Sequence, residues 1–193
     1  MKTVHRTRRL TIGLLAFCGL AIATTATAKN PKEVTLEIVD NELVITSKKT
    51  DNDCPLIGSG GKGCIKVKKG EKSEIYLHLK NNKCTLESGT KFELNAVYLG
   101  GYNSPGKPDP SAFGFATTSQ ADYDKVNADF NIADRTSGLV NTIEKKENKI
   151  GINNENQSKY TVWYKVEAIC KRGDGKAPHV RYSDPRVKNG GAD

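Results

Sequence analysis

The strongest constraint on the fold is a strict two-residue alternation between Tyr160 and Cys170. The side chains that share one face of this segment are Tyr160, Val162, Tyr164, Val166, Ala168 and Cys170. Successive side chains of a β-strand point to opposite faces of a sheet, so the pattern predicts a long strand with one apolar face. Because it offers more core residues than any other segment, we expect it at the centre of a sheet.

Shorter alternations of the same kind run through the rest of the chain. They lie in residues 34–38, 65–67, 75–79, 90–99, 128–133 and 150–152. Helical spacing is poor, and it predicts at most one short helix, over residues 119–126, with Ser119 as its N-cap. Seven to nine short strands separated by Asn, Gly, Asp and Pro turns predict an all-β fold, a single antiparallel β-sandwich domain. In an antibody-type domain a tryptophan lies on an early strand, between the two bridged cysteines. Here Trp163 lies on the late strand. We therefore expect the sandwich to be immunoglobulin-like in its layered architecture alone.

Residues 1–28 have the three parts of a secretory signal peptide. Four basic residues precede an apolar run from Leu10 to Ala23, and Ala26-Thr27-Ala28 provides a small-x-small cleavage site. The apolar run is shorter than the roughly 20 residues of a membrane-spanning helix. We therefore expect cleavage before Lys29, export to the periplasm or the extracellular space, and no transmembrane segment after cleavage.

Removal of the leader changes the charge balance. The whole chain has 30 Lys and Arg against 22 Asp and Glu. The leader contains four of the basic residues and none of the acidic ones, so the remainder has 26 against 22, a net charge of +4. This balance does not predict nucleic-acid binding. Residues 29–193 have the length of one domain, and we expect residues 171–193 to form a partly flexible basic tail.

Four cysteines remain after cleavage, namely Cys54, Cys64, Cys84 and Cys170. An even number of cysteines in an exported chain indicates two disulfides. Of the three possible connectivities we favour Cys54–Cys64, which closes a glycine-rich loop, and Cys84–Cys170, which joins distant strands. The spacing lacks the C-x-x-C pairs of zinc sites, so no metal site is predicted.

Residue patterns typical of catalysis are scarce. The chain has no H-E-x-x-H metal pair and no G-x-S-x-G nucleophile motif. The glycine-rich segment from Gly58 to Gly63 lacks the spacing of a phosphate-binding loop. We therefore predict no cofactor and no catalytic residue, and a non-enzymatic binding or structural module is favoured over a small secreted hydrolase or an enzyme inhibitor.

The candidate contact residues are aromatic and basic. Tyr102, Phe113 and Phe115 lie in or beside a loop rich in glycine and proline, and Arg181 and Arg186 lie in the basic tail. Aromatic residues and arginine dominate the binding energy of interfaces. We expect a partner, either a protein or an anionic cell-surface component, to be contacted through the 102–115 loop or through the C-terminal strand. The alternative is that the rings pack into the core and the tail is solvated.

Overall fold

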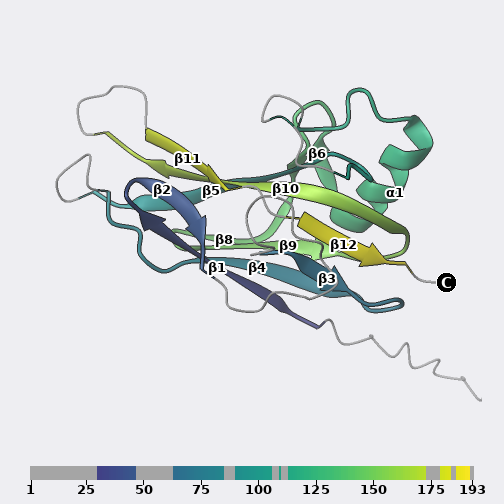
Figure 1. The fold of residues 1–193 in the computed structure, drawn as a ribbon, viewed down its shortest axis with the longest axis horizontal. Coiled ribbons are helices and arrows are strands. Elements are labelled where there is room, and N and C mark those ends of the chain that lie inside the picture. Colours follow the sequence, from purple (N-terminus) through teal and green to yellow (C-terminus); the bar gives the residue numbers. More distant parts are fainter. Residues whose placement is uncertain are drawn as a thin grey trace, which may run out of the picture.

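The computed structural model describes residues 30–46, 63–84, 90–105, 109, 113–172, 179–183 and 186–191. These residues form two β-sheets that lie one above the other, with a single helix at one end (Figure 1). The all-β prediction is confirmed. Residues 1–28, where a leader is predicted, Cys54 and most of the glycine-rich loop lie outside the described residues.

The first sheet has five strands in the order β2-β1-β4-β9-β8. In chain order they are β1 (Lys32–Val39), β2 (Glu42–Ile45), β4 (Ser73–Leu79), β8 (Thr142–Lys146) and β9 (Lys149–Asn154). Asp40 and Asn41, both at positive φ, make the tight turn between β1 and β2.

The second sheet has seven strands, and its main order is β3-β12-β10-β5-β7-β6. Its members are β3 (Ile65–Val67), β5 (Phe92–Gly100), β6 (Ile132–Asp134), β7 (Leu139–Val140), β10 (Lys159–Cys170), β11 (His179–Ser183) and β12 (Arg186–Gly190). The long strand β10 is central, as the sequence predicts. One of its edges pairs with β5, and the other pairs first with β12 and then with β11.

Both sheets contribute their inner faces to one hydrophobic core. Leu36, Ile75 and Ile152 of the first sheet and Leu99 and Val166 of the second are fully buried. Each comes from an alternation visible in the sequence, because burial of one face of a strand selects every second residue as apolar.

The antiparallel prediction is wrong for two pairs of strands. β1 pairs with β4 in parallel, and β12 pairs with β3 in parallel. Parallel neighbours need a crossover rather than a hairpin. In both pairs the chain passes through the other sheet between the two paired strands. The alternation within one strand does not show in which direction its neighbour runs.

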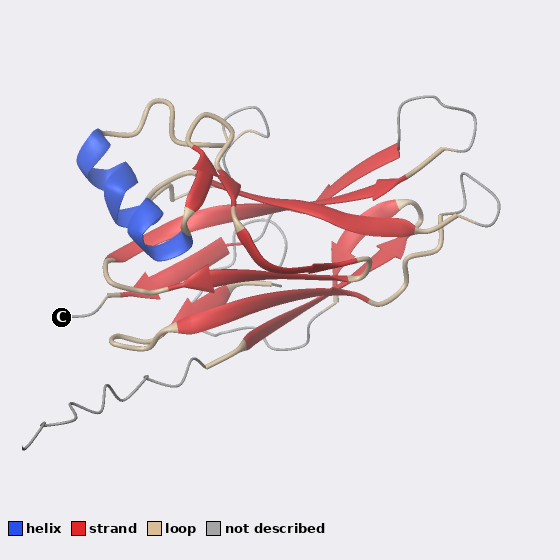
Figure 2. Ribbon diagram, turned by 180° about the vertical axis from the view of Figure 1, so that it is seen from behind, coloured by secondary structure: helices blue, strands red, loops and turns tan. Residues whose placement is uncertain are grey.

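The helix α1 (Gln120–Phe130) begins where the sequence predicts, because the Ser119 hydroxyl accepts a hydrogen bond from the Asp122 N–H at 3.2 Å. It continues beyond the predicted end at residue 126, and Figure 2 shows it packed at one end of the two layers. The segment 128–133, expected as a strand, is therefore divided between α1 and β6. Phe130 is buried on the helix, and Asn131 at φ 55° ends it.

A disulfide joins Cys84 to Cys170, with the two Cα atoms 6.2 Å apart. Cys84 lies in the connection that leaves the first sheet after β4, and Cys170 ends β10 in the second sheet. This is the long-range pair expected from the sequence. Cys64 is also disulfide-bonded, and the Cys54 half of the other expected pair lies outside the described residues.

Candidate functional site

The outer face of the seven-stranded sheet gathers aromatic rings around one lysine. The ammonium group of Lys165 on β10 lies 4.9 Å from the ring centre of Tyr98, 4.9 Å from that of Phe113 and 5.0 Å from that of Tyr182. The rings come from β5, from the segment after the 102–112 region and from β11. Each distance is within the range in which a cation is attracted to the negative face of a ring.

A carboxylate lies beside this cluster. Glu167, two residues after Lys165, is 9% exposed, and it accepts hydrogen bonds from the Asn95 side chain and from the Tyr98 hydroxyl at 3.4 Å. Burial and the charge of Glu167 raise the pKa of Tyr98 to about 12. Burial and the same carboxylate raise the pKa of Tyr182. Both hydroxyls therefore keep their protons and remain hydrogen-bond donors at neutral pH.

Trp163 and Arg186 extend the cluster along the sheet. They are register partners on β10 and β12, and the Arg186 guanidinium carbon lies 5.6 Å from the centre of the indole ring. Trp163 is only 4% exposed, and its indole N–H has no hydrogen-bond partner among the described residues. We call the set Tyr98, Phe113, Trp163, Lys165, Tyr182 and Arg186 the aromatic face.

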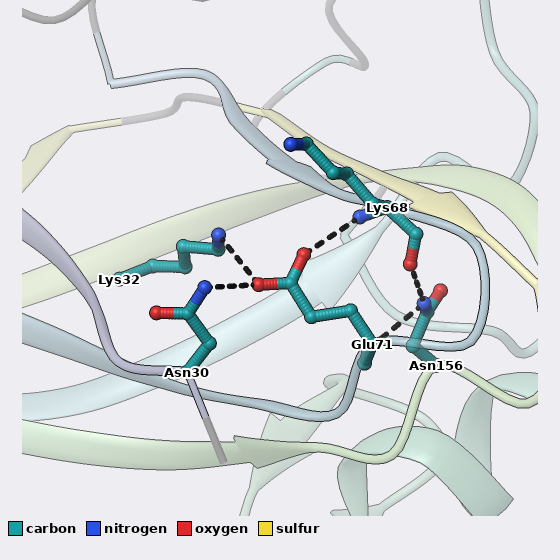
Figure 3. A network of polar contacts seen from close by, with 5 residues as sticks. All are labelled: Asn30, Lys32, Lys68, Glu71 and Asn156. Carbon is teal, nitrogen blue, oxygen red and sulfur yellow. Dashed lines mark hydrogen bonds and ion pairs between the residues drawn. The ribbon is translucent and has the colours of Figure 1, made fainter. Parts of the chain in front are cut away.

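A polar network holds the turn that follows β3, the strand at the border of the seven-stranded sheet. Glu71, in the turn after β3, accepts hydrogen bonds from the Lys32 ammonium at 3.0 Å, the Lys68 N–H at 3.2 Å and the Asn30 amide (Figure 3). Burial alone would raise the pKa of Glu71, but these donors lower it below its ordinary value. The Asn156 amide donates to the carbonyls of Lys68 and Glu71 at 2.6 and 2.9 Å (Figure 3).

The turn held by this network lies against the end of β12, the strand with which β3 pairs in parallel. The turn that it holds continues directly from β3, and the Gly70 N–H also donates to the Gly191 carbonyl at 2.7 Å just after β12. The backbone of this turn lies so close to Gly190 that a Cβ there would be 2.5 Å from the Lys69 nitrogen. Lys66 is thereby placed opposite Lys188.

Two of the five predicted contact residues, Phe113 and Arg186, lie on the aromatic face. Phe113 is 7% exposed and takes part through its contact with Lys165. Phe115 is fully buried, since its ring packs against Tyr123 in the core with the ring centres 6.0 Å apart. For Phe115 the alternative that the ring packs into the core is therefore the one observed.

The other two predicted residues point elsewhere. Tyr102 is partly buried against Tyr160, with ring centres 5.5 Å apart, and burial and Asp122 raise its pKa. The Arg181 guanidinium donates to the Asn41 carbonyl in the β1–β2 turn, so it connects β11 to the other sheet. Neither residue contributes to the aromatic face.

The last strand, β12, does not have the free edge that addition to a partner's sheet requires. β12 is hydrogen-bonded on one side to β10 and on the other to β3. Such strand addition needs unpaired backbone groups along an edge. The C-terminal strand expected for this role, around Val180 and Tyr182, is β11, which pairs with β10. Contact of a partner through it stays a prediction.

Sequence reasoning missed Tyr98, Trp163, Lys165, Glu167 and Tyr182 as members of one site. A signal was present on β10, where Trp163 lies between the polar residues Thr161 and Lys165 on the outward face. A large aromatic at a position expected to face solvent indicates a covered or contacting surface. The partners of this tryptophan come from other strands, so only the structure identifies them.

Comparison of the sequence with protein-family models and with curated proteins finds no match. Within the described ranges, no three His, Cys, Asp or Glu side chains gather as a metal-binding group. No helix in the part of the chain that the structure describes is long and apolar enough to cross a membrane.

Proposed function

We propose that the chain is an exported, non-enzymatic binding module with an immunoglobulin-like sandwich architecture, which acts in the periplasm or outside the cell after cleavage before Lys29. The leader-like residues 1–28 support export, and the Cys84–Cys170 disulfide is consistent with an oxidising compartment. Residues 29–193 form the single mature domain in this proposal.

The proposed contact surface is the aromatic face. The observation that carries it is the position of the Lys165 ammonium within about 5 Å of three ring centres. One of these rings, Tyr182, is 49% exposed on the outer side of the sheet. Tyrosine, tryptophan and arginine are the residues whose truncation most often weakens an interface, and this face contains all three.

The test compares two exposed hydrophobic residues. The processed protein is immobilised and incubated with a cell-envelope extract of the organism that makes it, and the retained protein and polysaccharide are quantified. Tyr182→Ala should reduce retention of a defined component at least fivefold. Ile143→Ala is the matched control, because Ile143 is also 49% exposed but lies on β8 of the other sheet.

Two results would contradict the proposed surface. Equal retention by wild type and Tyr182→Ala would exclude a contribution of the exposed ring. Equal losses in Tyr182→Ala and Ile143→Ala would indicate a general effect of removing surface hydrophobicity. Circular dichroism of both variants establishes that they are folded before retention is compared.

A further inference from the structure

A lysine, an asparagine and a glutamate from three strands form a continuous series of hydrogen bonds between the two sheets. The Lys145 ammonium donates to the side-chain oxygen of Asn95 at 3.3 Å, and the Asn95 amide nitrogen donates to the Glu167 carboxylate. Lys145 lies on β8 of the five-stranded sheet, whereas Asn95 and Glu167 lie on β5 and β10 of the seven-stranded sheet. An amine and a carboxylate thus contact opposite ends of one carboxamide group.

A β-bulge gives Asn95 this position. Along the β5–β10 pair, Ala96 is opposite Glu167 and Leu94 is opposite Ala168, so Asn95 is an extra residue without a register partner on β10. Such a residue bends the strand and redirects its own side chain, and bulges are common beside reactive sites. Here the redirected amide contacts one side chain of its own sheet and one of the other sheet.

The other sheet holds Lys145 in place at its edge. Lys145 is the register partner of Ile150, which is fully buried, so alternation places Lys145 on the core-facing side of β8. The turn after β8 is attached to β5, because the Leu94 N–H donates to the Glu147 carbonyl at 3.0 Å. Since β8 is the last strand of its sheet, the lysine reaches Asn95 while it is still exposed to solvent.

An ordinary surface ion pair does not account for this lysine. The nearby Lys146 and Lys149 both contact the Glu144 carboxylate at 2.6 Å. Lys145 instead donates to an uncharged amide whose nitrogen is already bound to a buried carboxylate. Solvation explains the charge of an exposed lysine, but it does not explain this contact.

Glu167 is placed to move a proton at the amide. It is 9% exposed, and it also accepts a hydrogen bond from the Tyr98 hydroxyl at 3.4 Å. Its carboxylate contacts the Asn95 nitrogen, which is the atom that leaves when an amine attacks the amide. A proton-transfer group must lie within hydrogen-bond reach of the atom that it protonates, and this contact meets the condition.

We propose that Lys145 and Asn95 become joined by an isopeptide bond, with Glu167 as the proton-transfer group. The Lys145 ammonium first releases one proton to solvent, and its Nζ attacks Cγ of Asn95. The new Nζ–Cγ bond forms and the Cγ–Nδ2 bond breaks. Glu167 takes the surplus proton from Nζ and delivers it to Nδ2, which leaves as ammonia. The carboxylate is regenerated, so the step needs no oxidant and no further reactant.

Proximity makes the reaction feasible without an enzyme. Groups that a fold holds in contact react with effective concentrations on the order of 10⁵ M or more. Each molecule reacts once, so a slow step is sufficient. The product is a covalent link between the two sheets that, unlike the Cys84–Cys170 disulfide, survives reduction. This inference goes beyond the proposed function and does not depend on the aromatic face, which contains neither Lys145 nor Asn95.

The test is the intact mass of the processed protein, measured by mass spectrometry after reduction and denaturation. Wild type should be lighter than its sequence requires by one molecule of ammonia. Lys145→Ala and Glu167→Gln should each have the full mass of their sequence. Lys146→Ala is the matched control on the same strand, because Lys146 contacts Glu144 instead, and it should retain the loss.

Tryptic digestion identifies the residues that are joined. Wild type should give one branched species in which the peptides around Asn95 and Lys145 are linked. Closure of Asn95 to a succinimide also releases ammonia, but it gives no branched peptide and persists in Lys145→Ala. Circular dichroism establishes that each variant is folded, and Lys145→Ala tests the bond by itself if Glu167→Gln does not fold.

Three outcomes would overturn the inference. They are a full sequence mass in wild type, a mass loss that persists in Lys145→Ala, and an unchanged mass loss in folded Glu167→Gln. The first two exclude the isopeptide bond, and the third excludes the role of Glu167 in forming it. Each can occur together with retention of an envelope component that depends on Tyr182, so the proposed contact surface is tested separately.

Discussion

Asn154 and Asn189 exchange two side-chain hydrogen bonds between the two sheets. The Asn154 amide nitrogen donates to the Asn189 oxygen at 2.8 Å, and the Asn189 nitrogen donates back at 3.2 Å. Asn154 ends β9 in the five-stranded sheet, and Asn189 lies on β12 in the seven-stranded sheet. Both side chains are buried, so this pair is a polar link between the layers within an apolar core.

The link extends to the helix. Asn189 also donates to the Asp129 carboxylate on α1 at 3.2 Å, and the Tyr160 hydroxyl donates to the same carboxylate at 2.7 Å. Tyr160 begins the apolar face of β10, whereas Cys170 ends the strand in a disulfide. The central strand is therefore fixed at one end by a hydrogen-bond network and at the other by a covalent bond.

Asn154→Ala should lower the free energy of unfolding by about 1–3 kcal/mol, because it removes the donor to the buried side-chain oxygen of Asn189. Urea unfolding followed by circular dichroism measures the change. Asn153→Ala is the control on the outward face of the same strand, and its effect should be within about 0.5 kcal/mol of wild type. The Asn154→Ala and Asn189→Ala substitutions should be coupled by at least about 0.5 kcal/mol. A double variant whose loss of stability equals the sum of the two single losses would contradict this coupling.

Replacement of Cys84 and Cys170 together by alanine should cost about 4–5 kcal/mol, because the disulfide closes a loop with a sequence separation of 86. The expected mechanism is an increase in the conformational freedom of the unfolded chain. Thermal unfolding of the double variant, compared with wild type under oxidising conditions, measures the loss. A difference below about 1 kcal/mol would show that the disulfide does not restrict the unfolded chain.

The strands are the most predictable part of the molecule. Apolar residues at every second position of β1, β4 and β10 mark their buried faces, since a strand with one dry face must alternate. Ser119 likewise marks the start of α1 through a hydrogen bond that only a short polar side chain can make. These features depend on neighbours within a few residues, so they are visible in the sequence.

The parallel pairings and the aromatic face depend on contacts between distant segments. Lys165 meets Tyr98 and Tyr182 because β5 and β11 both pair with β10, and strand order is not encoded in the period of any single strand. The prediction of a strand at Phe130 is wrong for a related reason. Its alternation with Ile132 spans the helix end at Asn131, where two elements meet.

Two glycines with nearly the same backbone conformation should respond very differently to substitution. Gly70 has φ 72° and no atom within 4 Å of the position that a Cβ would take, whereas Gly138 has φ 74° and a Cβ there would be 1.9 Å from the Leu99 carbonyl oxygen. Gly70→Ala should cost about 1–2 kcal/mol, the cost of the left-handed conformation alone. Gly138→Ala should cost at least about 3 kcal/mol, as measured by urea unfolding. Similar losses in both variants would contradict the close approach of Leu99.

Glu71→Gln should destabilise the protein by about 1–2 kcal/mol at pH 7, because hydrogen bonds to a charged carboxylate are stronger than those to an amide. The folded-state pKa of Glu71 is below the ordinary value of 4.5. Its contribution is therefore fully present above pH 4.5 and is lost as the pH falls through the folded pKa. Unfolding of wild type and variant between about pH 7 and pH 3 should show the two stabilities converging.

The control for this pH dependence is Glu147→Gln. Glu147 is 53% exposed and lies 3.9 Å from the Lys91 ammonium, so its substitution should change stability by less than about 0.5 kcal/mol at every pH. A stability gap between wild type and Glu71→Gln that stays constant across the same pH range would show that the charge of Glu71 is not responsible.

Tyr98 should titrate near pH 12, and Glu167→Gln should lower its pKa toward 10. Burial is the largest cause of the raised pKa and remains in the variant, while repulsion by the carboxylate is removed. A raised folded-state pKa contributes stability that is present below pH 10 and is lost as the pH rises through about 12.

The ¹³Cζ shift of labelled tyrosine reports the titration, and Tyr98→Phe assigns the signal. Glu93→Gln, which removes a carboxylate 3.2 Å from Lys171 instead, should leave the pKa of Tyr98 near 12. A wild-type Tyr98 that titrates near 10 would show that its hydroxyl is neither buried nor close to the Glu167 carboxylate.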